Sequence, residues 1–333
     1  MKKYFPLFLA LFMLMALAGC SHVSNLTDRA LERIGWRASF EEQGDPGLTK
    51  RTVIAPFRYG KPDLAPQAKA LQQAVENALH EHPHIKLVDF RELQKASLEY
   101  GFAELVSEDR YLTGARHLGI NLIVVGDISG MYIDYNLMGW YGFRESHPQL
   151  TLEGQIRMVD GVRGTVHRYR NFKEVITIDD VEAQAIMTGR APEKEMIEQL
   201  TNAIIANNLP FIMEDIDALP WSGMVLKVEG SKVLVTGGQD TGFGPGDTLV
   251  LYSQSDRITT GGGHSIYMLG QPVGTVTLSE IMPDTSWGEV NFDQVEQDDI
   301  DVEGEEAEDN EWLEPKPDAF VYDVQPGQIV RVR

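Results

Sequence analysis

The sequence predicts an α+β protein, in which a mixed sheet packed with helices is followed by a small β-barrel. Two apolar runs, residues 52–57 and 120–128, are nearly continuous rather than alternating, a pattern typical of strands covered on both faces. Amphipathic stretches lie between these runs and indicate helices that pack on the sheet. After residue 220 the chain changes to short apolar runs separated by glycine turns, as in small barrels.

The first part of the chain divides into alternating strands and helices. Ala68, Leu71 and Val75 recur at steps of three and four and predict one face of a helix over 65–82. Further helices are predicted at 91–100, 108–118 and 192–209, and strands at 85–90, 131–135, 150–159 and 164–178. We expect Pro210 to end the last helix, because proline cannot continue the helical hydrogen-bond pattern. Leu219–Pro220 then separates an α/β domain, residues 51–218, from a β domain, residues 219–333.

The β domain combines short strands with glycine turns and one acidic insertion. Its strands are predicted at 223–229, 232–236, 248–252, 272–281, 287–292 and 320–333. The glycines of Gly242–Asp247 lack the Lys-Ser/Thr pair of a phosphate-binding loop and indicate tight turns instead. Residues 293–318 are dominated by Asp and Glu with a single lysine, which predicts an exposed acidic insertion.

Composition limits the partners of this chain. Its 333 residues are 43% hydrophobic, enough for real cores, and its formal net charge is −21. Lys2 and Lys3 are the only charges before residue 20, so the remainder carries a net charge of −23. Such a surface repels nucleic-acid phosphates, and we expect no nucleic-acid binding.

The N-terminus has the pattern of a processed export signal. A basic start is followed by an apolar core over 4–16 that is too short for a comfortable membrane span. Leu17-Ala18-Gly19-Cys20 resembles the lipobox of bacterial lipoproteins, which implies removal of the signal peptide 1–19 and attachment of acyl chains such as palmitate to Cys20. Ser21, rather than Asp, implies the outer membrane in enteric-type sorting, with residues 20–50 as a tether. The alternative is a plain secretory signal with an incidental cysteine.

An aromatic connection is the best candidate for a protein contact. The connection 136–147 contains Trp140, Tyr141 and Phe143 between glycines, which is unusual for a loop. These residues are the predicted partner contacts, because aromatic side chains are common anchors of interfaces. The alternative is that they cover an edge of the sheet.

The sequence has no complete metal-binding or catalytic motif. His80, His82 and His84 would share a face in a strand, but a helix end and Pro83 separate them, so we expect solvated histidines near a helix C-terminus. The acidic run from Asp299 resembles an EF-hand loop but has Asn310 where a glutamate is needed. The sequence also has no recognisable nucleophile elbow, metalloprotease motif or dinucleotide fingerprint. We therefore expect no enzyme, no cofactor and no specific metal.

Several motifs resemble known families. Thr52–Phe57, Leu118–Gly126 and Ile156–Gly164 resemble the TolB N-terminal/CsgG-type domain. Gly223–Val228, Thr241–Leu249 and Val324–Val330 resemble the SH3-like C-terminal domain of the flagellar assembly protein T (FlgT) family. These resemblances imply a TolB-N/CsgG-like mixed sheet followed by an SH3-like barrel, and a role in flagellar basal-body assembly. The lipobox and the lack of an extra N-terminal domain depart from FlgT.

The combined hypothesis is a non-enzymatic lipoprotein of the outer membrane that faces the periplasm. It would assemble or stabilise an envelope complex, first of all one of the flagellar basal body, and self-association is left open. One alternative is a component of a curli-type secretion channel, which needs hairpins of about ten alternating residues per strand. Glycines interrupt residues 131–143, which argues against such a membrane-spanning hairpin. Another alternative is a lipoprotein that activates a peptidoglycan synthase.

Overall fold

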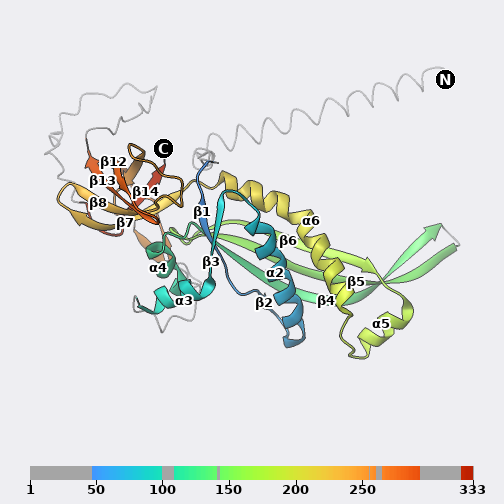
Figure 1. Ribbon diagram of the computed structural model, residues 1–333. Coiled ribbons are helices and arrows are strands. Elements are labelled where there is room, and N and C mark those ends of the chain that lie inside the picture. Colours follow the sequence, from blue (N-terminus) through green and yellow to red (C-terminus); the bar gives the residue numbers. More distant parts are fainter. Residues whose placement is uncertain are drawn as a thin grey trace, which may run out of the picture. The chain divides into compact units, whose positions relative to one another are not determined.

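The computed structural model describes residues 47–99, 109–140, 143–254, 256–259, 265–292 and 324–332. All of them belong to one compact unit, Asp45–Arg333. Its mixed α+β architecture contains one mixed sheet with helices and one closed barrel of six strands (Figure 1). Cys20, the signal peptide, most of the tether and the acidic insertion lie outside the described residues.

The mixed sheet has the strand order β3-β1-β4-β5-β6, with the short β2 beside β4. β1 runs parallel to β3 and β4, whereas β4, β5 and β6 are antiparallel neighbours. The strands are β1 (Lys50–Ile54), β2 (Arg58–Tyr59), β3 (Ile85–Val88), β4 (Leu122–Trp140), β5 (Phe143–Asp160) and β6 (Val166–Thr177). The predicted mixed sheet is therefore confirmed.

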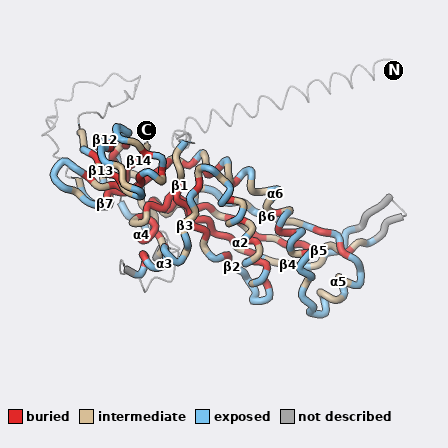
Figure 2. Tube along the Cα trace, in the orientation of Figure 1, coloured by how far each residue is buried: buried red, intermediate tan, exposed pale blue. Residues whose placement is uncertain are grey.

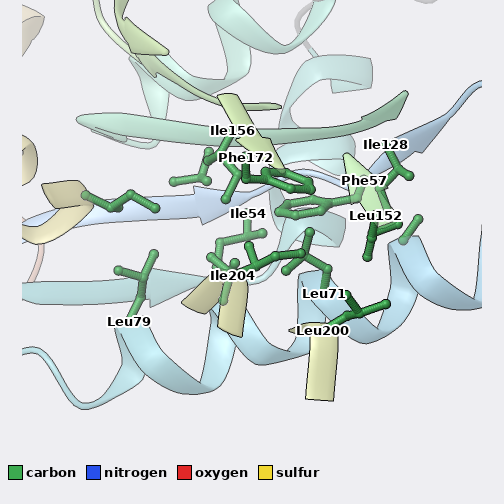
Figure 3. Packing of buried hydrophobic residues seen from close by; sticks show 14 of the residues in the cluster. Ile54, Phe57, Leu71, Leu79, Ile128, Leu152, Ile156, Phe172, Leu200 and Ile204 are labelled. Atoms are coloured by element: carbon green, nitrogen blue, oxygen red, sulfur yellow. The ribbon is translucent and has the colours of Figure 1, made fainter. Parts of the chain in front are cut away.

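Helices cover one face of the sheet along its length and the other face only in part. They are the 3₁₀ helix η1 (Pro62–Leu64) and the α-helices α2 (Ala65–His80), α3 (Phe90–Glu99), α4 (Asp109–His117), α5 (Asp180–Met187) and α6 (Lys194–Ala218). The larger core joins α2 and α6 to the sheet through residues such as Leu71, Leu152 and Ile204 (Figure 3). The smaller core packs α3 and α4 on the opposite face, around Val53 and Ile123. Among the described residues no helix is both long and apolar enough to span a membrane.

Helix α6 is longer than predicted. The expectation that Pro210 ends it is wrong, because the helix runs on to Ala218. Proline removes one N–H donor and its ring crowds the carbonyl four residues before it, but the turns beyond it bury Ile212 and Ile216 in the larger core. Lys50, which is fully buried, donates from Nζ to the terminal carbonyls of Ile216 (2.6 Å) and Asp217 (3.2 Å). Packing and this cap outweigh the local cost of the proline.

The barrel follows directly after α6. Its closed strand order is β12-β13-β8-β7-β14-β9, and a separate hairpin, β10–β11, is inserted between β9 and β12. Trp221 and Phe243 meet edge to face in its core, with ring centroids 4.7 Å apart. The strands are β7 (Ser222–Glu229), β8 (Lys232–Thr236), β9 (Thr248–Tyr252), β10 (Arg257–Thr259), β11 (Ser265–Tyr267), β12 (Pro272–Ile281), β13 (Thr285–Asn291) and β14 (Ile329–Val332). The prediction of a small barrel is confirmed, while its SH3-like type stays a prediction.

Specific polar contacts join the barrel to the sheet. Arg51 donates from Nε (2.9 Å) and Nη2 (2.6 Å) to Asp240 Oδ2, which also accepts from Lys86 Nζ at 2.8 Å. Burial disfavours the charged form of Asp240, but the hydrogen bonds from Lys86 and Arg51 outweigh it and lower the pKa of this carboxyl. Asn121 Nδ2 donates to Ser222 O at 2.6 Å. The junction near residue 219 is therefore held by specific hydrogen bonds.

Candidate contact site on the β4–β5 hairpin

The hairpin β4–β5 extends past its neighbours in the sheet. The two strands pair from Leu122 and Asp160 to Trp140 and Phe143. β6 pairs with β5 only as far as Gln149, and β2 pairs with β4 only as far as Ile128. The outer six pairs therefore form a two-stranded ribbon of roughly 20 Å, at about 3.4 Å per residue.

Burial falls along β4 toward the end of the hairpin. Every residue from Asn121 to Gly126 is buried, but none from Ser129 to Asn136 is, as the change from red to tan and pale blue in Figure 2 shows. Tyr132 is 38% exposed and Tyr135 is 46% exposed. This part of β4 therefore presents aromatic surface to solvent.

Tyr132 belongs to a row of side chains on the sheet face opposite the larger core. It pairs with Thr151, which in turn pairs with Val175 of β6. Thr151 lies between Leu150 and Leu152, both in the larger core, so the alternation of a strand turns Thr151 to the opposite face. Thr151 is buried between the exposed Tyr132 and Val175. The row is therefore exposed at its two ends, Tyr132 and Val175, and buried at Thr151 between them.

Polar groups fix Tyr132 in this row. Its hydroxyl donates to Glu153 Oε2 at 3.1 Å, and Lys173 Nζ lies 5.8 Å from the centre of its ring. A hydrogen bond with Tyr132 and the negative charges of Glu153 and Asp134 raise the pKa of Lys173. These contacts orient the ring before any partner arrives, which lowers the entropic cost of binding.

The structure places the predicted contact residues at the end of this hairpin. Trp140 and Phe143 are the last paired residues of β4 and β5, and Tyr141 lies outside the described residues. The expectation that 136–147 is a loop is wrong, because both sides of it are strand. Backbone pairing between the two strands tolerates Gly139, although glycine has a weak strand propensity and suggested a break. The glycine argument against a long hairpin therefore also fails.

Two other predicted features have plain structural roles in the described part of the chain. Only 9% of the His82 side chain is exposed, and its Nε2 lies 3.6 Å from Asp217 Oδ2, so the expectation of solvated histidines is wrong for His82. No group of three metal-ligating side chains occurs within the described ranges. A shallow hollow between α5 and the start of α6 has a cavity volume of only about 10 Å³. That is far smaller than typical ligand pockets of about 300–1,000 Å³.

Sequence reasoning missed Tyr132 and Tyr135 as candidate contacts. The alternation Met131-Tyr132-Ile133-Asp134 was the available signal, since Met131 and Ile133 pack against the larger core and the residues between them do not. The exposed Tyr169 on β6 was missed in the same way.

Comparisons with known proteins find only weak likenesses to solved structures. No protein-family model matches this sequence, and no curated protein matches it. The hypothetical protein CT253 from Chlamydia trachomatis is 11% identical, with a TM-score of 0.32 over 48% of this chain and 95% of its own. Lipoprotein GNA1162 from Neisseria meningitidis is 9% identical, with a TM-score of 0.30 over 48% of this chain and 99% of its own. The C-terminal domain of LpoB from Escherichia coli is 16% identical, with a TM-score of 0.26 over 42% of this chain and 92% of its own. Similarity this weak says nothing about partners, and the TolB-N/CsgG-like and FlgT-like resemblances stay predictions.

Proposed function

We propose that this chain is a lipid-anchored protein of the outer membrane that faces the periplasm and acts by contact rather than catalysis. It assembles or stabilises an envelope complex, and the β4–β5 hairpin is its main contact surface. The lipobox at Cys20 supports the anchor.

The observation that carries the contact role is the two-stranded end of the hairpin. A two-stranded ribbon buries little apolar surface and is marginal on its own in water. This one presents the exposed Tyr135 and ends in the pair Trp140 and Phe143, and the exposed Tyr132 lies on β4 just before the ribbon begins. Exposed aromatic residues on such an extension favour a protein interface, where tyrosine and tryptophan are common anchors.

Among envelope complexes the flagellar basal body is our first candidate. The support is the resemblance of Thr241–Leu249 and Val324–Val330 to the FlgT family. Activation of a peptidoglycan synthase and participation in a secretion channel are the other two candidates. They differ in the proteins that the chain would recover from detergent-solubilised envelopes.

Affinity purification of the full chain tests this proposal. We expect recovery of basal-body proteins, and the triple change of Trp140, Tyr141 and Phe143 to Ser should abolish it and reduce motility. Ile258→Ser, which removes an exposed side chain from the barrel insertion, is the control. Thermal melting separates loss of contact from loss of folding. Unchanged recovery and motility of a folded triple variant would contradict the contact role, and recovery of cell-wall synthases alone would replace the flagellar assignment.

A further inference from the structure

Positive charge is concentrated at the β5–β6 turn of this acidic protein. Residues 157–173 contain five Arg or Lys and one acidic residue, Asp160, in a chain of net charge −21. At physiological salt, charges are screened beyond about 8 Å, so a local cluster acts largely independently of the net charge. The turn is therefore a local anion-attracting surface.

Two buried acids face this surface. Asp160 Oδ1 accepts from the backbone N–H groups of Val162 (2.8 Å) and Arg163 (2.9 Å) and so shapes the turn. Asp215 of α6 lies 3.5 Å from Arg168 Nε and 3.1 Å from Arg170 Nη2. One carboxylate thus serves two arginines. Toward the outer end of β6, Glu174 accepts from Asn207, and Glu153 and Asp134 act on Lys173, so positive charge is in excess only near the turn.

Of the arginines near the turn, Arg168 is the most exposed. Nε of Arg163 and Nε of Arg170 are buried and have no hydrogen-bond partner within the described residues, so an incoming partner would meet the outer nitrogens of these guanidinium groups instead. The Arg168 side chain is 61% exposed, and Tyr169, which points to the opposite face of β6, is 66% exposed, so the two flank the edge of the strand. Arginine and tyrosine together are the residue types most enriched at interface hot spots.

Contacts from α4 and β11 hold the backbone of the turn in place. Arg116 of α4 donates from Nη1 to Val162 O (3.1 Å) and from Nη2 to Gly327 O (2.7 Å), and its guanidinium lies 4.0 Å from the centre of the Tyr267 ring. Tyr267 N donates to Arg163 O at 2.8 Å. These contacts fix the backbone that carries Arg163, so the surface is preorganised.

We propose that this arginine patch, defined as Arg163, Val166, Arg168, Tyr169 and Arg170, binds an extended acidic segment of the partner protein. The proposal rests on the contact function proposed above and names the chemistry of the partner. Arginine binds carboxylates bidentately, and β6 is the edge strand of the sheet as the described residues build it, which offers backbone groups to an extended chain. The acidic remainder of the surface would repel long polyanions and anionic bilayers, because these extend beyond the patch. A short acidic segment avoids this repulsion.

A labelled eight-residue peptide of alternating Glu and Val serves as the probe, with the corresponding Lys-Val peptide as its counterpart. By fluorescence anisotropy at 50 mM salt, we expect the full chain to bind the Glu peptide at least tenfold more tightly than the Lys peptide. The double change Arg163→Gln and Arg168→Gln should weaken binding at least tenfold. Arg190→Gln, at an exposed ion pair with Glu193, is the matched control and should change nothing. Amide hydrogen exchange should slow over 166–173 when the peptide binds.

Several results would overturn the proposal. Equal binding of both peptides, or full binding by the folded double variant, would remove the patch as the site. Binding only after residues 295–316 are replaced by a Gly/Ser linker would identify the chain's own acidic insertion as the occupant. If the double variant loses binding to phosphatidylglycerol vesicles but still binds the Glu peptide, the patch binds lipid rather than an acidic segment. The serine variant of the hairpin should still bind the peptide, so failure of the hairpin proposal and failure of this one are distinguishable.

Discussion

Asp240 joins the barrel to the sheet, and Asp240→Asn should destabilise the whole compact unit. The carboxylate oxygen Oδ2 accepts two hydrogen bonds from Arg51 and one from Lys86. An asparagine has the same shape but no charge. The side chain of Arg51 is only 10% exposed, so the variant leaves a nearly buried guanidinium without its counter-ion.

The size of the effect follows from these contacts. A hydrogen bond to a charged group contributes about 1.5–3 kcal/mol to stability. The bond from Lys86 counts for less, because that side chain is 49% exposed and screened by solvent. An amide oxygen can still accept from Arg51, which recovers part of the loss. We expect the free energy of unfolding at pH 7 to fall by about 2–4 kcal/mol.

Urea denaturation at several pH values checks this prediction. Because the folded protein lowers the pKa of Asp240, the stabilisation is complete above the unfolded value of 3.8 and disappears as pH falls through the lower folded value. The difference between wild type and variant should therefore be full at pH 7 and shrink below about pH 3.8. Glu198→Gln, at an exposed pair with Lys194, is the control and should leave the free energy of unfolding unchanged within error. A loss at Asp240→Asn no larger than this control, or one that persists undiminished in acid, would refute the reasoning.

Three further predictions concern the anchor and the stability of the chain. Lys50→Met should lower the free energy of unfolding by about 2–3 kcal/mol, because the carbonyls at the end of α6 lose their buried ammonium donor. Urea denaturation measures this loss, with Lys69→Met at an exposed position as the control, and an equal loss in both variants would contradict the capping role of Lys50. Cys20→Ser should release the protein from outer-membrane fractions, whereas mature protein that still fractionates with membranes would exclude lipid attachment. Replacing residues 295–316 with a Gly/Ser linker should leave the melting temperature within a few degrees of wild type, since like charges oppose compaction; a large drop in calorimetry would mean that the segment is packed.

The fold was predictable where local pattern and tertiary environment agree. The boundaries of β8, β9 and β12 coincide with the predicted strands, because glycine turns delimit short alternating runs. Helix α5 was not predicted, although Asp179 and Glu182 form a capping box that marks its start. The long α6 and the long hairpin were missed because distant packing and strand pairing override the local effect of proline and glycine.

The contact surfaces were less predictable than the fold. The aromatic residues at the hairpin end stand out in the sequence, and Tyr132 could have been found from alternation. The arginine patch could not have been found from the sequence, because its net charge depends on which acidic side chains lie against it in the fold. Asp215 reaches Arg168 and Arg170 from a helix more than forty residues away, and Arg116 supports the turn from α4.

Site-specific photo-crosslinking in intact cells tests the contact role of the hairpin most directly. A photoreactive phenylalanine replaces Tyr135 on the hairpin or, as a matched control, Tyr59 on β2; each tyrosine is 46% exposed. We predict that the probe at position 135 captures a defined envelope protein and that the probe at position 59 captures none. Equal capture at both positions, or no capture at position 135 in cells with a normal level of the protein, would contradict the account.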